Sequence, residues 1–155
     1  NLEEILKNIV DFLETRAKGK SQSLTLNLPK ASLPALMADP IAMESIFGNL
    51  ITNAINYTQE SGKIEVDVDL AGINIRVKVK DNGFGIADKY LKNIFERFYR
   101  VKDENTRYIT GTGLGLPIVK GLIDSLNGFI DVESTPGKGT VFTVLLPATQ
   151  EERFA

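Results

Sequence analysis

Two neighbouring segments of this chain alternate between apolar and polar residues, and this alternation restricts the fold more than any other feature. The segments are Lys63 to Leu70 and Ile73 to Asp81, and Ala71-Gly72 separates them. A period of two places every second side chain on the same face of a β-strand. The apolar face carries Ile64, Val66, Val68, Ile75, Val77 and Val79. We therefore expect an antiparallel hairpin with one face on a core and the other toward solvent.

A two-residue turn at Ala71-Gly72 fixes the register that we expect for this hairpin. It places Asp67 opposite Arg76 on the polar face. It also places Glu65 opposite Lys78, and opposite charges on facing positions stabilise a strand pair. Alanine is a poor residue for such a turn, so a β-bulge is the alternative at this position.

Helices and further strands are predicted on both sides of the hairpin. The chain opens with an amphipathic helix whose apolar residues are Leu2, Ile5, Leu6, Ile9, Val10, Phe12 and Leu13. Alternating leucines at Leu24 to Leu28 predict a strand. A second helix begins at Asp39-Pro40, because aspartate is a preferred N-cap and proline suits the first helical position. It ends near Tyr57, and its inward side carries Ile41, Ile46, Phe47, Leu50, Ile51 and Ala54.

The last part of the chain predicts a short helix toward Phe95 and then a longer one. The longer helix begins at Pro117, in the first helical position, and stops at Asn127-Gly128, which is a C-terminal signal. Two final strands, Phe129 to Thr135 and Thr140 to Leu146, flank a glycine-rich turn.

These elements predict an α/β protein. We expect a two-layer α/β sandwich, with a mixed and mostly antiparallel sheet and with helices on one face. The 155 residues fit one folded domain. We place that domain at residues 23–147, after a lead-in helix at 1–22 and before a polar tail at 148–155.

Composition excludes several classes of function. The chain has no histidine and no cysteine, which excludes imidazole catalysis, disulfides and thiolate metal sites. A net charge of -2 gives no electrostatic support to nucleic-acid binding. No apolar run approaches the roughly 20 residues of a transmembrane helix, and no signal peptide opens the chain.

Two asparagines interrupt the otherwise apolar second helix. Asn49 and Asn53 stand four residues apart, so their side chains project from one face. Two surface amides are the ordinary interpretation of such a pair. The apolar neighbours favour a functional interpretation, because amide oxygens suit a Mg²⁺ ion that already binds nucleotide phosphates.

Two glycine-rich segments are the other candidates. Asp81 to Ile86 follows a strand, where glycines let a ligand approach the backbone and the aspartate can accept hydrogen bonds from a base. Gly111 to Leu116 precedes a helix, where free amides bind phosphate. Neither segment has the dinucleotide fingerprint, because Asp88 and Ile118 stand where its last glycine belongs.

Taken in order, five segments resemble the catalytic ATP-binding domain of sensor histidine kinases. They are Asn49 to Thr58, Asp81 to Ile86, Ile94 to Arg100, Gly111 to Leu116 and Gly137 to Thr140. Each segment is weak evidence alone, but their order and spacing are specific. The resemblance covers about residues 39 to 147. It implies the Bergerat-type ATP-binding fold of the superfamily that type II topoisomerases, a heat-shock chaperone and mismatch-repair ATPases share.

The resemblance implies a role for each matching residue. Asn53 would be the principal Mg²⁺ ligand, with Asn49 supporting it, and Arg100 would reach the phosphates. Asp81 would accept a hydrogen bond from the adenine amino group, with Thr140 beneath it. The nucleotide-binding residues would be Asn53, Asn56, Tyr57, Asp81, Gly83, Gly85, Ile86, Arg100, Gly111, Thr112, Gly113, Leu114, Gly115, Leu116 and Thr140.

The resemblance also implies a lid, and the chain departs from the family pattern at two positions. Residues 101–110 would form a lid over the nucleotide, with Phe95 and Phe98 anchoring its base. Asn56 is neutral where the family usually has a basic residue, and Thr110 replaces a frequent glycine. Arg100 or Lys102 would compensate for the missing charge.

The resemblance implies that the chain donates the γ-phosphoryl group of ATP to a histidine outside it. The implied partners are the dimerisation and histidine-phosphotransfer domain and the receiver domain of a response regulator. The full-length protein would be a homodimer and this chain a monomer, in the cytoplasm, in a sensor that can be anchored in a membrane. No nucleic-acid partner is expected.

Two alternatives stay open at this point. The first is a hydrolytic ATPase of the same superfamily, which would have a glutamate at the position of Asn49. The second is a degenerate module that binds a partner without turnover. The asparagine at position 49 disfavours hydrolysis, and the retained Asn53, Asp81 and glycines disfavour the degenerate module.

Overall fold

The structure is a computed structural model that describes residues 1–36, 38–99, 101 and 115–148. Its strands form one mixed sheet in the order β1-β2-β3-β5-β4. β1 pairs in parallel with β2, and the other neighbours are antiparallel. The strands are β1 (Ser23–Asn27), β2 (Lys63–Ala71), β3 (Asn74–Asp81), β4 (Phe129–Thr135) and β5 (Gly139–Pro147).

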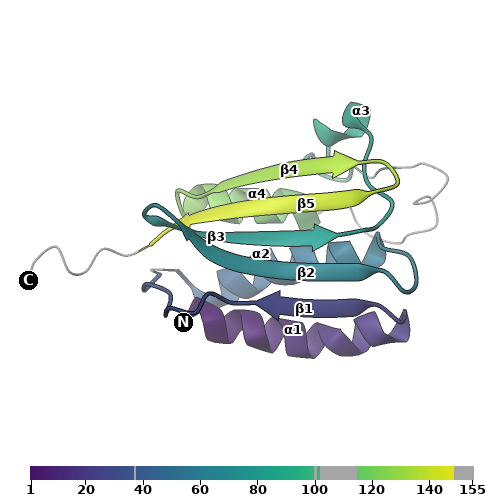
Figure 1. Ribbon diagram of the computed structural model, residues 1–155. Helices are drawn as coiled ribbons and strands as arrows, with labels where there is room; N and C mark the ends of the chain where they lie inside the picture. The colour runs from purple at the N-terminus through teal and green to yellow at the C-terminus, as the bar shows by residue number, and fades with distance from the viewer. Residues whose placement is uncertain (37, 100, 102–114, 149–155) are drawn as a thin grey trace, which may run out of the picture.

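The long helices cover one face of this sheet (Figure 1). The long helices are α1 (Leu2–Gly19), α2 (Pro40–Asn56) and α4 (Gly115–Ser125), and α3 (Asp88–Leu91) is a single short turn. The two-layer α/β sandwich predicted from the sequence is therefore confirmed. Among the described helices, none has both the length and the apolar composition of a membrane span.

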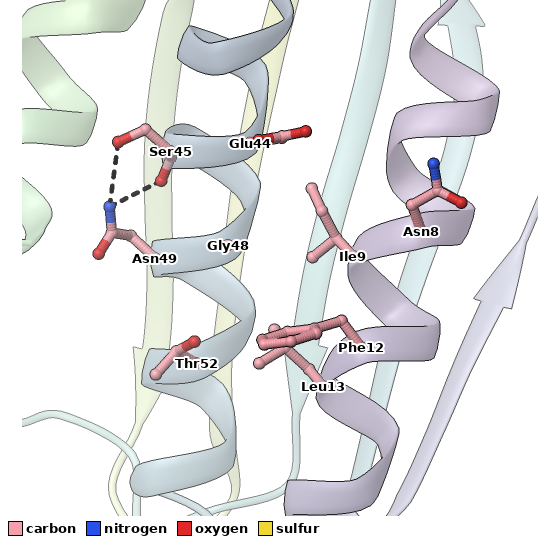
Figure 2. Close-up of a pocket in the computed structure, with 9 residues that line it drawn as sticks. All are labelled: Asn8, Ile9, Phe12, Leu13, Glu44, Ser45, Gly48, Asn49 and Thr52. Atoms are coloured by element: carbon pink, nitrogen blue, oxygen red, sulfur yellow. Dashed lines mark hydrogen bonds between the residues drawn. The ribbon is translucent and has the colours of Figure 1, made fainter.

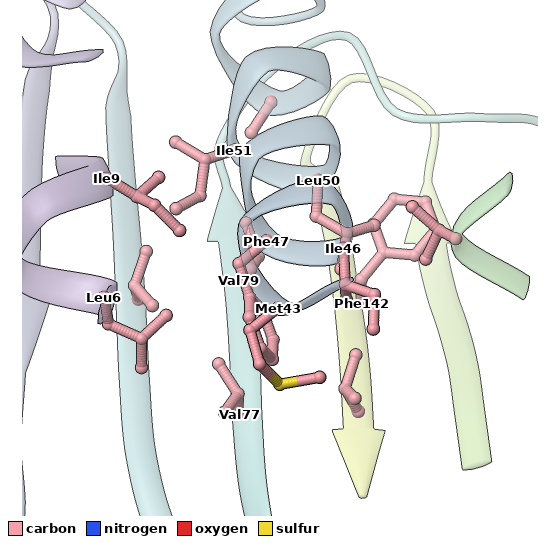
Figure 3. Close-up of a cluster of buried hydrophobic side chains, with 14 of the residues drawn as sticks. Leu6, Ile9, Met43, Ile46, Phe47, Leu50, Ile51, Val77, Val79 and Phe142 are labelled. Atoms are coloured by element: carbon pink, nitrogen blue, oxygen red, sulfur yellow. The ribbon is translucent and has the colours of Figure 1, made fainter. Parts of the chain in front are cut away.

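The core lies between the sheet and α2. Figure 3 shows Ile46, Phe47 and Leu50 of this helix packed toward Val79 of β3 and Phe142 of β5. The apolar face predicted for the hairpin is confirmed, because all six of its residues are at most 5% exposed. α1 adds Leu6 and Ile9 to the same core. The division of the chain after residue 22 stays a prediction.

The hairpin register differs from the predicted one by two residues. Ala71 pairs with Asn74, so the turn is Gly72-Ile73 and not Ala71-Gly72. Gly72 has a φ of 63°, a left-handed conformation that alanine adopts at a cost and that a two-residue hairpin turn requires. A shift of two leaves every side chain on its predicted face. The facing charged pairs are Glu65 and Lys80, Asp67 and Lys78, and Asp69 and Arg76.

The ends of α2 and α4 confirm one prediction and correct two. The Asp39 side chain caps α2 by accepting a hydrogen bond from the backbone N–H of Ile41 at 2.9 Å. Ile41 itself is 73% exposed, so its predicted inward position is wrong. α4 begins at Gly115, which makes Pro117 its third residue and not its first. Proline breaks no helical bond there, because the first four N–H groups of a helix have no partner within it.

Candidate nucleotide-binding site

The predicted site residues come from four separate elements. Asn49, Asn53 and Asn56 lie on α2 and Tyr57 is its C-cap, whereas Thr140 lies on β5. Asp81 ends β3, and the glycine loop follows it. Gly115 and Leu116 begin α4. Arg100, Gly111, Thr112, Gly113 and Leu114 lie outside the described residues, as does the predicted lid apart from Val101.

Asp81 is a hydrogen-bond acceptor placed at the end of a central strand. Its backbone faces Thr140 of β5 in the ladder. Its carboxylate accepts a hydrogen bond from the backbone N–H of Gly83 at 2.9 Å. Burial raises the pKa of Asp81 to about 6, and the backbone N–H groups of Gly83 and Thr140 oppose that rise. A partly desolvated carboxylate of this kind favours a ligand that brings a donor.

A pair of hydroxyl groups lies beside Asp81. The oxygens of Ser134 and Thr140 are 2.8 Å apart, and Thr140 is 6% exposed. Ser134 also approaches the Gly139 carbonyl at 3.0 Å and accepts from the N–H of Ile86 at 2.7 Å. Ser134 has one proton. When it donates that proton to Gly139, Thr140 donates to Ser134 and keeps only acceptor capacity for a ligand.

Close backbone packing makes glycine necessary in the loop after β3. A Cβ on Gly83 would lie 2.2 Å from the carbonyl oxygen of Tyr57, at the end of α2. Gly85 has a φ of 73°, and a Cβ there would lie 2.1 Å from the carbonyl oxygen of Thr135. The loop therefore holds the ends of α2, β3 and β4 together beside Asp81.

Asn49 presents its amide oxygen toward α4. Its amide nitrogen donates to the carbonyl oxygen of Ser45 at 2.7 Å, with the Ser45 hydroxyl 3.4 Å away (Figure 2). The oxygen consequently points away from Ser45. A Cβ built on Gly115 would lie 3.2 Å from this oxygen, so the first residue of α4 lies against Asn49.

Asn53 and Asn56 differ in their contacts. Within the described residues, the half-buried Asn53 side chain has no hydrogen-bond partner. The Asn56 oxygen accepts from the Arg16 guanidinium of α1 at 3.0 Å. Among described side chains, groups of three or more acidic residues that could hold a metal ion are absent. A metal at Asn49 and Asn53 would therefore take amide oxygens, and these suit Mg²⁺ when phosphates complete its ligands.

The two phenylalanines predicted to anchor the lid lie in different surroundings. Phe95 packs edge-to-face on Phe142 of the core, with ring centroids 6.5 Å apart. Phe98 is 72% exposed and has a φ of 64°. Phe98 is therefore not among the described residues that form the core. Its predicted role at the base of the lid stays a prediction, because residues 102–110 lie outside the described part of the chain.

A hollow of about 460 Å³ lies on the other side of Asn49, between α1 and α2. Figure 2 shows Phe12 of α1 pointing across it toward α2. Its lining is mainly apolar and does not include Asp81. The hollow therefore contains the amide of Asn49 but not the carboxylate acceptor described above. The lining residues are Asn8, Ile9, Phe12, Leu13, Glu44, Ser45, Gly48, Asn49 and Thr52.

Comparison with known proteins identifies the family. Residues 38–150 match the family model described as histidine kinase-, DNA gyrase B- and HSP90-like ATPase. The chain belongs to this family. It is 38% identical over 146 residues to the sensor histidine kinase WalK of Bacillus subtilis, covering 93% of this chain and 24% of WalK. It is 36% identical over 147 residues to the sensor histidine kinase AtsR of Burkholderia thailandensis, covering 92% of this chain and 24% of AtsR.

Solved structures agree with this assignment. The catalytic domain of the histidine kinase ThkA superposes with a TM-score of 0.82 at 27% identity, covering 97% of this chain and 96% of that one. Full-length ShkA in complex with AMPPNP gives a TM-score of 0.82 at 27% identity, covering 97% of this chain and 31% of that one. The resemblance to histidine kinase catalytic domains is confirmed. This ATPase-family domain spans about a quarter of the length of those curated relatives.

We expect adenosine binding by this ATPase-family domain to weaken about fivefold between about pH 7.5 and pH 5, because protonation of Asp81 removes an anionic acceptor. The pKa of about 6 places the change inside this window. Adenosine is the ligand to titrate by calorimetry, because the γ-phosphate of ATP changes its own charge near the same pH. Asp81→Asn should flatten the profile. A flat profile in the unsubstituted domain would contradict the prediction.

Sequence reasoning missed three groups that shape this site. The first is Ser134, which connects Ile86 to Thr140. The second is Ser45, which orients Asn49. The third is the pair Lys20 and Gln22, which contacts the end of α2. Alternation along β4 and β5 could have placed Ser134 beside Thr140, because the two pair in the ladder. No local pattern in the sequence indicates the contacts of Lys20 and Gln22.

Proposed function

We propose that this chain is the catalytic domain of a protein histidine kinase, which binds Mg-ATP and donates its γ-phosphoryl group to a histidine outside the chain. The observation that carries the proposal is the acceptor at Asp81, on a loop packed against the end of α2, together with the Asn49 amide oxygen that faces the first residue of α4. Relatives named sensor histidine kinases support the donor role. The acceptor must come from elsewhere, because this chain contains no histidine.

In this proposal the base and the phosphates bind to different elements. Asp81 accepts from the adenine amine, and Thr140, Gly83, Gly85 and Ile86 form the surrounding pocket. The triphosphate extends from there along α2 toward the beginning of α4, with Tyr57 beside it. Amides at a helix N-terminus stabilise phosphate charge, and this is the role proposed for Gly115 and Leu116. Arg100, Asn56 and the segment from Gly111 to Leu114 complete the proposed contacts.

Asn53 and Asn49 are the proposed Mg²⁺ ligands. A bound Mg²⁺ would neutralise charge on the phosphate oxygens during transfer. Ser45 holds the Asn49 amide in one orientation, which leaves its oxygen available. Asn53 has no competing partner within the described residues, so its oxygen is available too.

The transfer step itself needs little covalent help from the protein. A neutral imidazole nitrogen attacks the γ-phosphorus, and the bond from that phosphorus to the bridging oxygen breaks. ADP leaves with the bonding electron pair. Catalysis of such a step is mostly positioning and charge stabilisation. The domain would supply both by fixing the base at Asp81 and the metal at Asn53.

Hydrolysis is the competing function within this family. It requires a base that orients or deprotonates water. Asn49 lies one turn before Asn53 on the same face, and an amide cannot accept a proton there at neutral pH. We therefore favour transfer to histidine over hydrolysis.

We further propose the partners of the whole protein. They are the dimerisation and histidine-phosphotransfer domain of the same protein, and the receiver domain of a response regulator, which takes the phosphoryl group onward. The relatives named sensor histidine kinases support this. A full-length homodimer working in the cytoplasm, where ATP is available, follows from the same proposal.

The test is transfer from labelled ATP. Mixed with the helical histidine domain of its own protein and Mg²⁺, this chain should label only that domain, with an acid-labile phosphoryl group. Replacing the acceptor histidine by glutamine should abolish the label. Label on the isolated chain, or steady phosphate release without transfer, would contradict the proposal.

A further inference from the structure

The C-terminal end of α2 is held by two side chains from outside the predicted site. The last carbonyl groups of a helix lack partners within it, and α2 has no basic residue in its last turn. Lys20 Nζ instead donates to the carbonyl oxygens of Ile55 at 2.9 Å and Thr58 at 2.7 Å. Gln22 Nε2 donates to the same two oxygens at 3.0 and 2.8 Å. A cation is stabilising at this end of a helix, where the helix dipole is negative.

Lys20 is itself fixed in place by the backbone. It is the C-cap of α1, and its N–H bonds the carbonyl oxygens of Ala17 and Lys18. Its carbonyl oxygen accepts from the N–H of Ser61 at 3.1 Å, so the backbone of Lys20 is bonded to the loop that follows α2. Gln22 is 6% exposed, and its side-chain amide donates to the carbonyl oxygens of Ile55 and Thr58. The side chains of Lys20 and Gln22 therefore hold the end of α2 through hydrogen bonds to the carbonyl groups of Ile55 and Thr58.

Residues 57 and 58 in turn contact the glycine loop beside Asp81. The carbonyl oxygen of Tyr57 accepts from the N–H of Phe84 at 3.1 Å. A Cβ on Gly83 would lie 2.2 Å from that same oxygen and 2.9 Å from the Thr58 Cα. Gly83 also donates to the Asp81 carboxylate. A displacement of the α2 end would therefore move the loop that orients Asp81.

We propose that Lys20, assisted by Gln22, is a positioning residue for nucleotide binding: it fixes the end of α2, and thereby the loop at residues 83–85 and the carboxylate of Asp81. Lys20 touches neither the candidate base pocket nor the candidate metal ligands. It acts through the carbonyl groups of Ile55 and Thr58. The inference rests on the proposed function, because it assigns a residue to the same nucleotide site.

The test compares Lys20→Met, Lys20→Arg and Lys18→Met. Lys18 is a matched control, because it lies two residues away on α1 and its side chain forms an ion pair with the exposed Glu14 at 3.5 Å. Lys20→Met should weaken adenosine and Mg-ATP binding about fivefold each, since the donor to two helix-terminal carbonyls is lost. Lys20→Arg should restore most of that loss, and Lys18→Met should change nothing.

A second measurement separates positioning from stability and needs no nucleotide. Amide hydrogen exchange at Phe84 reports the bond to Tyr57. It should accelerate in Lys20→Met well below the melting temperature, while exchange in the middle of β3 stays unchanged. A lower melting temperature with unchanged Phe84 exchange and unchanged adenosine affinity would overturn the proposal.

The remaining outcomes are also decisive. Where Lys20→Met does not fold, Gln22→Leu replaces it, and the same acceleration at Phe84 is expected with a smaller loss of affinity; unchanged exchange in that variant overturns the proposal. Where the unsubstituted domain binds no ATP, the proposed function fails, whereas the exchange at Phe84 still decides whether Lys20 positions the loop.

Discussion

Asn53→Ala is expected to lower phosphoryl transfer to the histidine domain by about a hundredfold to a thousandfold, the range that loss of one group stabilising transition-state charge produces. The substitution removes the amide oxygen proposed to bind Mg²⁺ and leaves Asp81 and the glycine loop intact. Adenosine binding should therefore stay within about twofold of that of the unsubstituted domain, because adenosine carries no phosphate and needs no metal. Labelled transfer and calorimetry measure the two quantities.

Two further variants control this result. Asn49→Ala should show a milder loss of transfer, because the oxygen of Asn49 is proposed only to support the metal. Asn8→Ala removes an exposed amide from α1 that is not among the proposed metal ligands, and it should have no effect. Equal losses of adenosine and Mg-ATP affinity in Asn53→Ala would show that the helix had been disturbed, and the proposed metal role would then fail.

The parts of this fold that the sequence predicts are those that depend on local chemistry. Alternation with a period of two places six valines and isoleucines on the buried face of β2 and β3. This holds for both the predicted and the observed register, because a shift by an even number of residues leaves each side chain on the same face. Asp39 and Pro40 define the beginning of α2, because a cap and a fixed φ are properties of the residues themselves. The register itself depends on which residue can adopt a positive φ, and Gly72 takes that position in preference to Ala71.

The candidate site divides in the same way. Asn49, Asn53, Asp81 and the glycines stand out because polar or small residues interrupt apolar elements. Apart from Ser45, which lies four positions before Asn49, the residues that orient them do not stand out, because their partners are distant in sequence. Lys20 lies 35 and 38 positions from the carbonyl groups it contacts, and Ser134 lies 48 positions from Ile86. Only the folded arrangement brings such pairs together.

A second large effect is expected at the base. Asp81→Asn should weaken ATP binding by about tenfold to a hundredfold, since a hydrogen bond to a charged group is lost and the amide places a donor against a donor. The variant should remain folded. Burial raises the pKa of Asp81 to about 6, above its ordinary value of 3.8. Because its pKa is raised in the folded state, the Asp81 carboxyl contributes to the stability of the fold below about pH 4, and this contribution is lost as pH rises through 6. The neutral amide of Asp81→Asn avoids that loss at pH 7.

The same residue is expected to select ATP over GTP by at least about tenfold, because an unpaired buried polar group costs about 1–3 kcal/mol, a charged one such as Asp81 costs more, and each 1.4 kcal/mol is one decade. Ionised Asp81 only accepts hydrogen bonds, so it matches the exocyclic amine of adenine. Guanine has a carbonyl oxygen at that position, which would set two acceptors against each other. Asp81→Asn should therefore narrow the difference between the ATP and GTP dissociation constants. Equal constants in the unsubstituted domain would show that Asp81 does not recognise the base.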